Sequence, residues 1–433
     1  MSASNEFYEK AEAVESELVG SRGLAVIEKL SGRSFISIVI TQFLGAFNDN
    51  AFKQLILLVA VDLAMKQDVS YYQPLAGAVF AIPFVLFSGF AGSLSDRFSK
   101  TFIIRFCKVW EILVMVLGGV AFFIEDMTLL FFTLFLMGAQ SAFFGPGKYG
   151  IFPELLPPRS LSKANGIVLM TTYLAITLGT ASAGLLKDGL EAEGDLYKAQ
   201  GGLVLLAILG TMAAFGIRRA PVADPEIKLK GKVIGDLLPT LKSIFADRSF
   251  RCVALTYAYF WGLGAALLML CNSYGKVLMK LDDAPTSMLL VYLSVGIALG
   301  AFGGGLISKG KVDFRVYYWG LGLLLASLAA LVWAHLAVLA ASGTLFILGL
   351  AGGMFALPLQ TSVQLWSQDN LRGRVIAAVN FLCFISIFLS SLVFYLARQY
   401  VPIEWIGVSL AGLTVMVHLL ARRGLSKAAE QLS

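Results

Sequence analysis

Apolar residues dominate twelve long runs along the chain, each of 18 or more residues and separated by short polar breaks. A helix needs about 20 mainly apolar residues to cross the hydrocarbon core of a bilayer. Strands of a membrane β-barrel would be about 10 residues long and would alternate strictly, whereas the segment 129–137 is apolar on every side. The pattern therefore predicts twelve transmembrane helices, at 34–61, 73–93, 103–124, 128–147, 162–186, 199–217, 251–274, 286–307, 316–334, 343–366, 375–397 and 403–421.

The composition agrees with an all-α membrane protein. Of the 433 residues, 58% are apolar and 14% are charged, whereas about a quarter are charged in an ordinary soluble domain. The four cysteines lie singly inside apolar runs, and there are only two histidines. We therefore expect neither a disulfide framework nor a metal site, and we expect no cofactor.

Lysine and arginine residues are distributed unevenly between the two sides of the predicted membrane. If the N-terminus is cytosolic, 26 of the 34 fall in the tails and even-numbered loops or within the first three residues of the spans that follow them, and 6 fall in the odd-numbered loops, with Lys53 and Lys108 deeper inside spans. Because these residues resist translocation, the bias places both termini in the cytosol. Orientation thus explains the net charge of +6, and we expect no nucleic-acid partner.

The longest break between spans is basic and divides the chain into two equal sets of spans. It predicts a cytosolic tail at 1–33, a six-helix bundle at 34–217, a basic cytosolic linker at 218–250, a second six-helix bundle at 251–421 and a cytosolic tail at 422–433. Two such halves resemble the organisation of major facilitator transporters, in which the substrate site lies near the midplane between the halves. An unrelated twelve-helix fold is the alternative.

The centre of the first span is polar. It contains the run Asn48, Asp49 and Asn50, with Lys53 one helical turn further on. A carboxylate at the bilayer centre costs about 2.5–3.5 kcal/mol, so it should face the bundle interior with a partner. Lys53 is the expected partner of Asp49, because residues i and i+4 share a helix face. A functional site is favoured over a purely structural ion pair.

The third span contains a second charged pair, Lys108 and Glu111, at i and i+3. It lies closer to the cytosolic end, where the long lysine side chain could reach the headgroups. A structural and a functional role are therefore equally supported, and the pair is a supporting candidate for substrate binding.

The connection between the second and third spans reads GSLSDRFSK at 92–100. It resembles the cytosolic signature loop of the major facilitator superfamily, which implies a gate made of Gly92, Asp96, Arg97 and Lys100. Gly92 would allow close helix contact, and the basic residues would pair across the two halves when the cytosolic side is closed. Arg97 and Lys100 as plain orientation charges are the alternative. The corresponding segment at 305–311, GLISKGK, has no acidic residue.

Glycines recur at every fourth position in two later spans. Gly296, Gly300 and Gly304 lie in the eighth span, and Gly349 and Gly353 lie in the tenth. Small residues at this spacing let helix backbones approach closely, so we expect close helix packing rather than pore lining or dimerisation.

Three segments together resemble the bacterial lysophospholipid transporters, and especially the transporter portion of members fused to an acyltransferase. They are QFLGAFNDN at 42–50, FFGPGKYGIFPELL at 143–156 and LSKANG at 161–166. The resemblance implies a major facilitator fold that moves lysophosphatidylethanolamine-type lipids from the outer to the inner leaflet of the bacterial cytoplasmic membrane, where they are reacylated. A separate acyltransferase would then be a partner, and the transporter would be a monomer among membrane lipids.

A lysophosphoethanolamine headgroup carries an ammonium and a phosphate. Asp49 can bind the ammonium, and Lys53, Lys108 or Lys148 can bind the phosphate. Lys148 as a headgroup anchor for the fourth span is the alternative. The chain departs from the family at 265–268 and 381–384, where AALL and FLCF replace a span-7 arginine and a span-11 acid. Headgroup recognition is therefore expected in the N-terminal half.

Three other functions have less support in the sequence. An acyltransferase would need a histidine with an aspartate five positions after it. The residue five positions after His335 is Ala340, and the residue five positions after His418 is Arg423. We therefore expect no enzyme activity. A proton-coupled exporter of drugs or organic cations is the main alternative, because a lone intramembrane acid suits a cation. A receptor or scaffold without transport is disfavoured by the charges at the midplane.

Overall fold

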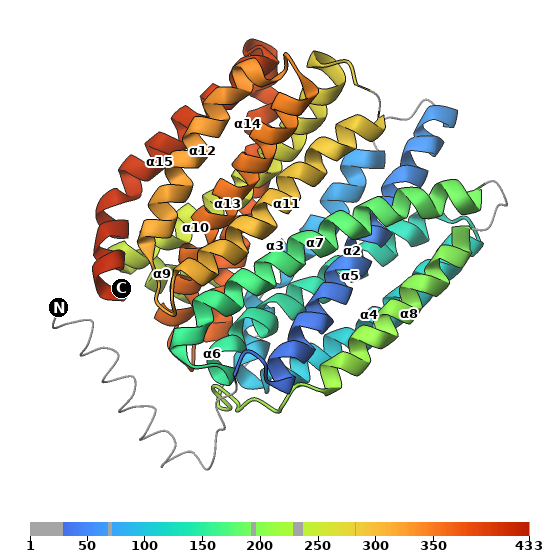
Figure 1. Ribbon diagram of the computed structural model, residues 1–433. Coiled ribbons are helices and arrows are strands. Elements are labelled where there is room, and N and C mark those ends of the chain that lie inside the picture. Colours follow the sequence, from blue (N-terminus) through green and yellow to red (C-terminus); the bar gives the residue numbers. More distant parts are fainter. Residues whose placement is uncertain (1–28, 68–71, 192–195, 228–236, 282, 433) are drawn as a thin grey trace.

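The computed structural model describes residues 29–67, 72–191, 196–227, 237–281 and 283–432, and the regular structure in these ranges is helical (Figure 1). The predicted tail at 1–33 therefore lies largely outside the described residues. The elements are α2 (Arg33–Gln67), α3 (Tyr72–Arg97), α4 (Lys100–Phe123), α5 (Met127–Gly150), α6 (Phe152–Leu155), α7 (Pro158–Glu191), α8 (Leu196–Phe215), α9 (Leu237–Ala246), α10 (Arg248–Ser273), η1 (Tyr274–Leu278), α11 (Asp283–Ile307), α12 (Phe314–Ala334), α13 (Val338–Trp366), α14 (Arg372–Tyr400) and α15 (Ile403–Leu432).

Eleven of the described helices are long and apolar enough to cross a membrane, so the chain is a multi-pass membrane protein. They coincide with the second to twelfth predicted spans. The first predicted span corresponds to α2, which has 35 residues but is not among the eleven. Its centre contains two asparagines, an aspartate and a lysine, which lower the hydropathy of any window that includes them.

The last helix is longer than the sequence predicts. The segment 422–432, expected to be a tail, continues α15 because Leu425, Ala428 and Leu432 are buried on one side of it. Gly424 supports this contact, since a Cβ atom there would overlap the Cys252 side chain of α10.

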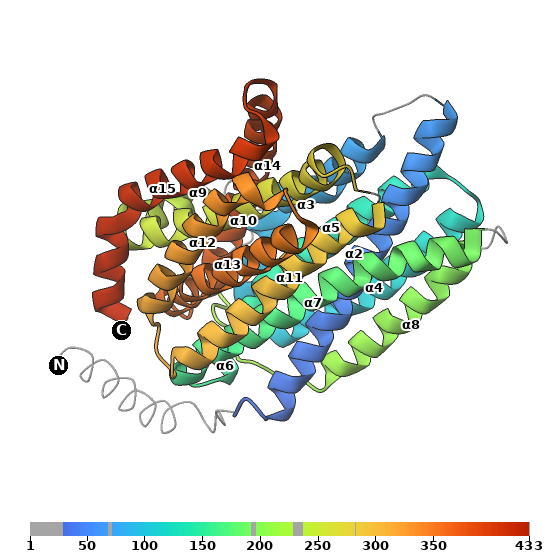
Figure 2. The ribbon, with the colours of Figure 1, turned by 45° about the horizontal axis from the view of Figure 1, so that its top comes forward.

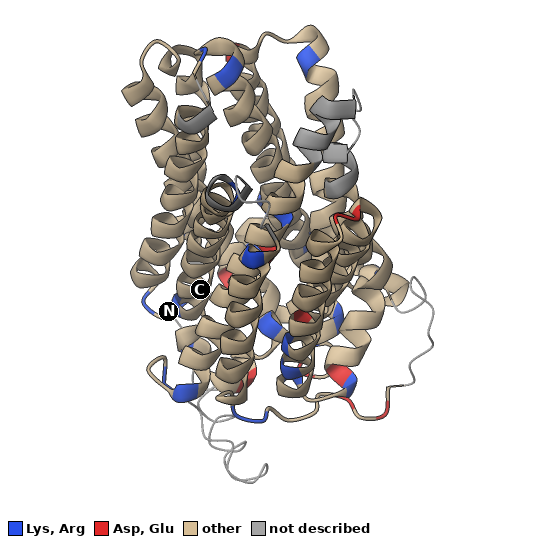
Figure 3. Ribbon diagram, turned by 90° about the vertical axis from the view of Figure 1, so that its right-hand side faces the viewer, with Lys and Arg blue, Asp and Glu red and all other residues tan. Residues whose placement is uncertain are grey.

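The N-terminal and C-terminal halves of the chain occupy different sides of the molecule. Helices α2–α8, blue to green, lie on one side, and α10–α15, yellow to red, lie on the other (Figure 1). Helices α4 and α8 run side by side at one edge in both ribbon views (Figure 2). Charged residues gather mainly in the lower half of the view in Figure 3. The start of α2 and the end of α15 lie at that same end of the molecule (Figure 1).

The glycines of α11 and α13 pack these helices against each other, as the sequence predicts. A Cβ atom on Gly296 or Gly300 would overlap a backbone oxygen of α13, and one on Gly349 or Gly353 would overlap a backbone oxygen of α11. The prediction of close helix packing is confirmed, and the contact lies within one chain.

The two sides of the molecule meet closely at the end that contains the connection between α3 and α4, here called the closed end. There α3 packs on the start of α14 through Gly92, whose added Cβ would lie 2.8 Å from the Ala377 Cβ and 2.8 Å from the Arg374 Cα. Helix α7 packs on α11 at the same end, where a Cβ on Gly166 would lie 2.7 Å from the Ala301 oxygen. The predicted role of Gly92 in close helix contact is confirmed.

The Gly92→Ala substitution should weaken the closed end. Overpacking of this kind costs about 1–3 kcal/mol, and 1–2 kcal/mol shifts a two-state ratio by roughly 5–30-fold. Ser95, which is 0% exposed in α3, reports on the contact after replacement by cysteine in a background without the four native cysteines. We expect a hydrophilic maleimide to label Cys at position 95 several times faster in the Gly92→Ala variant.

The control is Gly303→Ala in α11, because a Cβ atom at Gly303 meets nothing within 4 Å. Equal labelling rates in Gly92→Ala, Gly303→Ala and the unmodified background would contradict the role of Gly92 in closing this end.

Candidate functional site

Helix α2 presents its polar centre to helices α4 and α5. Asn48 is 0% exposed, and its Nδ2 donates a hydrogen bond to Glu111 Oε1 at 3.2 Å. Asp49 Oδ2 accepts a hydrogen bond of 2.6 Å from the Ser141 hydroxyl of α5. The other carboxylate oxygen, Oδ1, is buried without a hydrogen-bond partner among the described residues. Asp49 therefore retains an acceptor for a further donor.

The prediction that Asp49 and Lys53 form an ion pair is wrong, because each side chain has a different partner. Lys53 Nζ donates instead to Asn50 Oδ1 at 3.3 Å and lies 5.2 Å from the centre of the Phe80 ring of α3. The i,i+4 spacing places both charged residues on one face of α2, but Asp49 turns to α5 and Lys53 turns to α3. The two charges are thus held by different helices, and neither neutralises the other by direct contact.

Lys108 and Glu111 form a buried ion pair inside the N-terminal half. Their charged atoms are 2.5 Å apart, and the exposed fractions of the two side chains are 1% and 2%. Gln140 Nε2 donates to Glu111 Oε2 at 3.5 Å and to the Cys107 oxygen at 3.1 Å. Of the two alternatives for Lys108, the structure does not support contact with the headgroups, because its Nζ is enclosed by the protein.

Two glycines make room for the Lys108 ammonium group. A Cβ atom would lie 2.9 Å from its Nζ at Gly210 of α8 and 3.2 Å from it at Gly45 of α2. The ammonium group therefore sits among α2, α4 and α8, already paired with Glu111. Burial and pairing together indicate a structural role for this pair.

Lys148 lies apart from the polar centre of α2. It occupies the last turn of α5, seven positions beyond Ser141, which is about two helical turns. Its side chain is 9% exposed, and its Nζ lies 4.5 Å from the centre of the neighbouring Tyr149 ring. A cation at the C-terminal end of a helix is stabilised by the helix dipole. The structure thus brings Asn48, Asp49, Asn50 and Lys53 together, but it does not add Lys148 to them.

At the closed end, Asp96 connects the two sides of the molecule. The Asp96 carboxylate is 0% exposed and accepts hydrogen bonds from the backbone N–H groups of Gly373 at 2.7 Å and Arg374 at 3.0 Å. It also accepts from Arg374 Nε at 3.2 Å. The first N–H groups of a helix have no partner within the helix, so the start of α14 is well suited to bind a carboxylate.

The basic residues of the same connection do not cross between the halves, contrary to the prediction. Lys100 pairs with Glu154 of α6 in its own half. Arg97 lies 5.9 Å from the centre of the neighbouring Phe98 ring. Asp96, and not Arg97 or Lys100, contacts the other half, because the start of α14 presents hydrogen-bond donors.

Further polar residues join the halves at this end, and the sequence analysis missed them. Arg374 Nη2 also lies 3.4 Å from Asp224 Oδ2 of the linker. The amides of Asn165 in α7 and Gln364 in α13 exchange hydrogen bonds of 2.7 and 3.1 Å. The only signal in the sequence was the polarity of Gln364 and Asn165 at the ends of apolar runs, which does not identify partners almost 200 positions apart.

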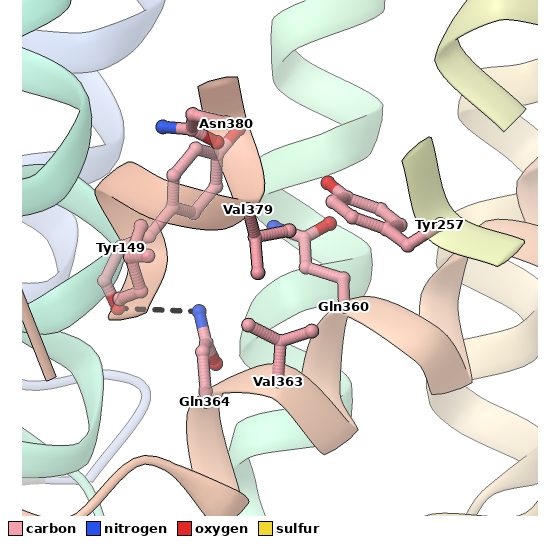
Figure 4. Close-up of a pocket in the computed structure, with 8 residues that line it drawn as sticks. Tyr149, Tyr257, Gln360, Val363, Gln364, Val379 and Asn380 are labelled. Atoms are coloured by element: carbon pink, nitrogen blue, oxygen red, sulfur yellow. Dashed lines mark hydrogen bonds between the residues drawn. The ribbon is translucent and has the colours of Figure 1, made fainter. Parts of the chain in front are cut away.

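A small cavity lies above these contacts, between the two sides of the molecule (Figure 4). It is lined by Tyr149, Tyr257, Gln360, Val363, Gln364, Ile376, Val379 and Asn380. These residues come from α5, α10, α13 and α14, and all of them are uncharged. The cavity agrees with the expectation that the C-terminal half contributes no charge to the interior.

The chain is similar to known transporters in sequence. The lysophospholipid transporter LplT of Photorhabdus laumondii is 28% identical over 343 residues, which cover 78% of this chain and 82% of that protein. The transporter of the same name from Klebsiella pneumoniae is 28% identical over 361 residues, covering 81% of this chain and 85% of that protein.

The fold is similar to that of solved transporters. The human organic anion transporter MFSD10 has a TM-score of 0.73 and 13% identity, with 89% of this chain and 99% of that chain covered. The Escherichia coli fucose:proton symporter FucP has a TM-score of 0.69 and 16% identity, with 90% and 98% covered. At these identities the likeness shows the fold alone.

The family model described as Major Facilitator Superfamily matches residues 38–391. This range extends from α2 to α14 and includes the polar centre of α2, the closed end and the cavity. The chain therefore belongs to the major facilitator superfamily.

Proposed function

We propose that this protein is a secondary transporter that moves a lysophospholipid across the bacterial cytoplasmic membrane by alternating access. The observation that carries the proposal is the arrangement of Asp49 and Lys53. Asp49 has a buried oxygen without a partner, and Lys53 is held one turn away by a neutral amide. Relatives named as lysophospholipid transporters cover most of the chain.

The headgroup of a zwitterionic lysophospholipid matches these two charges. Its ammonium can donate to Asp49 Oδ1, and its phosphate can accept from Lys53. Lys108 is unsuited to the phosphate because Glu111 already neutralises it and both side chains are buried. Of the three lysines that the sequence offers for the phosphate, Lys53 is therefore the one favoured by the structure.

Alternating access requires that the closed end opens in another state. The contacts of Asp96 with Gly373 and Arg374 form only while α3 and α14 are together. They favour the closed state by their own free energy, and a bound substrate shifts the balance only by its differential affinity for the two states. Asp96 and Gly92 thus act as parts of the gate, while Arg97 and Lys100 keep to their own half.

We further propose twelve membrane crossings arranged as two six-helix halves, with α2 as the first crossing. An even number of crossings places both termini on one side, and the bias of basic residues puts that side in the cytosol. The lipid would move from the outer to the inner leaflet, for reacylation by a separate acyltransferase. The protein would act as a monomer, without enzyme activity of its own.

Export of an organic cation, coupled to protons, is the second candidate. The free oxygen of Asp49 favours it as well, because a lone buried carboxylate binds either a proton or a cation. Lys53 argues against it, since a nearby ammonium group repels a cationic substrate.

Replacement of Asp49 by asparagine should abolish most lipid movement, because it keeps the volume but removes the charge. A hydrogen bond to a charged group is worth about 1.5–3 kcal/mol, so we expect transport to fall by roughly tenfold or more. The measurement follows labelled lysophosphatidylethanolamine from the outer leaflet into an inner-leaflet reacylation assay.

Asp126→Asn is the matched control, because Asp126 caps α5 through a bond to the Leu129 N–H that asparagine can also accept. Wild-type transport by Asp49→Asn would remove this residue from the site. Loss of organic-cation export in Asp49→Asn, in cells where the protein makes no difference to lysophospholipid, would instead support the exporter.

Loss of either partner of the Lys108–Glu111 pair should destabilise the protein, because it leaves a buried charge without its counterion. The cost of breaking such a pair is about 3–5 kcal/mol. We expect Lys108→Met and Glu111→Gln each to lower the thermal unfolding temperature in detergent. The double variant should be more stable than the sum of the two single effects predicts. Additive effects, or unchanged stability with lost transport, would contradict the structural role.

The proposed orientation is tested by labelling of cysteines in intact cells. Leu336, in the connection between α12 and α13, is 76% exposed, and Ser243 lies exposed in α9. We expect a membrane-impermeant maleimide to label Leu336→Cys from outside and to label Ser243→Cys only after the cells are opened. The reverse pattern would overturn the orientation.

A further inference from the structure

Gln360 lies at the cavity between the two sides of the molecule with its hydrogen-bonding capacity unused. Its side chain is 4% exposed, and neither its amide nitrogen nor its amide oxygen has a hydrogen-bond partner among the described residues. Figure 4 shows the amide group of Gln360 at the cavity, next to Tyr257 and Val379. Tyr149 of α5, on the other side, and Asn380 of α14, on the same side as Gln360, belong to the same lining.

A buried amide without partners is costly, at about 1–3 kcal/mol for each unsatisfied group. Where such a group borders a cavity, as Gln360 does, a molecule that enters the cavity can supply the hydrogen bonds. A hydroxyl group can satisfy both ends of the amide, because it donates to Oε1 and accepts from Nε2, and it can displace a water molecule that makes the same two bonds. The cavity is about the size of one water-sized group, which a hydroxyl would fill.

The lining selects for a neutral group. Tyr149, Tyr257, Gln364 and Asn380 offer hydroxyl and amide groups, and the remaining lining residues are aliphatic. An ammonium or a phosphate placed here would lose its hydration without a counterion, which is far more costly than the burial of a hydroxyl. The charges of a lipid headgroup therefore belong at Asp49 and Lys53, and its hydroxyl groups suit this cavity.

The cavity lies on the path between the charged site and the closed end. On α5, Ser141 binds Asp49, Gly145 faces Asn380 of α14, and Tyr149 lines the cavity. These three positions are four residues apart, so they follow one face of the helix. Gln364, one turn beyond Gln360 on α13, already takes part in the contacts of the closed end with Asn165. A lipid that moves from Asp49 towards the closed end passes Gln360.

We propose that Gln360 is a specificity-determining residue that binds a hydroxyl group of the lysophospholipid. The inference rests on the proposed function. It gives the C-terminal half of the protein a role in recognition that needs no charge. The hydroxyl has two possible sources: the glycerol carbon that lacks an acyl chain, and a headgroup that is itself a polyol. In the first case Gln360 distinguishes a single-chain lipid from a two-chain lipid, because esterification of that glycerol oxygen removes its proton and adds bulk.

The test compares transport of lipids that differ only in hydroxyl groups, one in the first pair and two in the second, in the wild type and in Gln360→Met. Methionine has the length of glutamine without its polar atoms. The first pair of lipids is lysophosphatidylethanolamine and its analogue with hydrogen in place of the glycerol hydroxyl. The second pair has the same single-chain backbone, with a phosphoglycerol headgroup in one lipid and a phosphopropyl headgroup in the other.

Gln200→Met is the matched control. Gln200 in α8 is also buried, at 1% exposed, and both of its amide atoms also lack a hydrogen-bond partner among the described residues, but it lies outside the cavity lining. Neither substitution removes a side-chain hydrogen bond to another described residue. Thermal unfolding of both variants at wild-type temperature or above therefore separates a loss of recognition from a loss of folding.

We expect the wild type to prefer the hydroxylated member of one pair by roughly tenfold, since one hydroxyl would donate one hydrogen bond and accept one. The preference should vanish in Gln360→Met and persist in Gln200→Met. A preference in the first pair identifies the glycerol hydroxyl as the source, and one in the second pair identifies the headgroup.

Equal preferences in the wild type and Gln360→Met would overturn the inference while leaving lysophospholipid transport intact. The same holds for a wild type that moves all four lipids at one rate. A wild type that moves none of the four lipids overturns the proposed function, and with it the inference that rests on it.

Discussion

A charge inside this bundle needs a counterion or a hydrogen-bond partner within the protein, and the arrangement of the interior depends on that constraint. In a bilayer no bulk water is available to solvate it, so a buried ion is stable only with a counterion and satisfied hydrogen bonds. Lys108 meets the requirement through Glu111, which in turn accepts from Asn48 of α2. Glycines at 45 and 210 leave the space that the ammonium group occupies. The pair therefore joins α4 to α2 through Asn48, packs against α8, and supports the rest of the polar centre of α2.

That support explains why Asp49 and Lys53 can remain incompletely paired. Asn48, their neighbour on α2, is hydrogen-bonded to Glu111. Asp49 accepts one hydrogen bond from the neutral Ser141, and Lys53 donates one to the neutral Asn50. Under the proposed function, a site that binds and releases a zwitterion cannot be satisfied by its own residues, because the substrate would then have to break an existing ion pair. The N-terminal half thus separates a permanent charge pair from a pair that is available to a ligand. The C-terminal half contributes neutral polar groups instead.

The hydrophobic pattern was sufficient to predict the long helices, because membrane spans are defined by length and polarity alone. It did not predict the short helices α6 and α9. The glycine spacing of α11 and α13 likewise predicted a contact that needs only the absence of side chains. Partner choice was not predictable in the same way. The i,i+4 rule places Asp49 and Lys53 on one face of α2, but it cannot show that Ser141 and Phe80 on other helices attract them to different sides. The same limit hid Arg374, Asp224 and the Asn165–Gln364 pair, whose partners are distant in sequence.

Apart from the Asp96–Arg374 ion pair, the described polar contacts between the halves are hydrogen bonds to backbone N–H groups or from side-chain amides, and the proposed alternating access accounts for this choice. A contact that breaks in every cycle should join groups that water can satisfy when they separate. The N–H groups at the start of α14 are of this type, since no helical carbonyl needs them, and so are the amides of Asn165 and Gln364. A bond between the two amides contributes about 1 kcal/mol net and a bond to the Asp96 carboxylate about 1.5–3 kcal/mol, sizes that a bound substrate can outweigh. The Lys108–Glu111 pair, whose separation would leave buried charges, lies wholly within one half, where no step of the cycle pulls it apart.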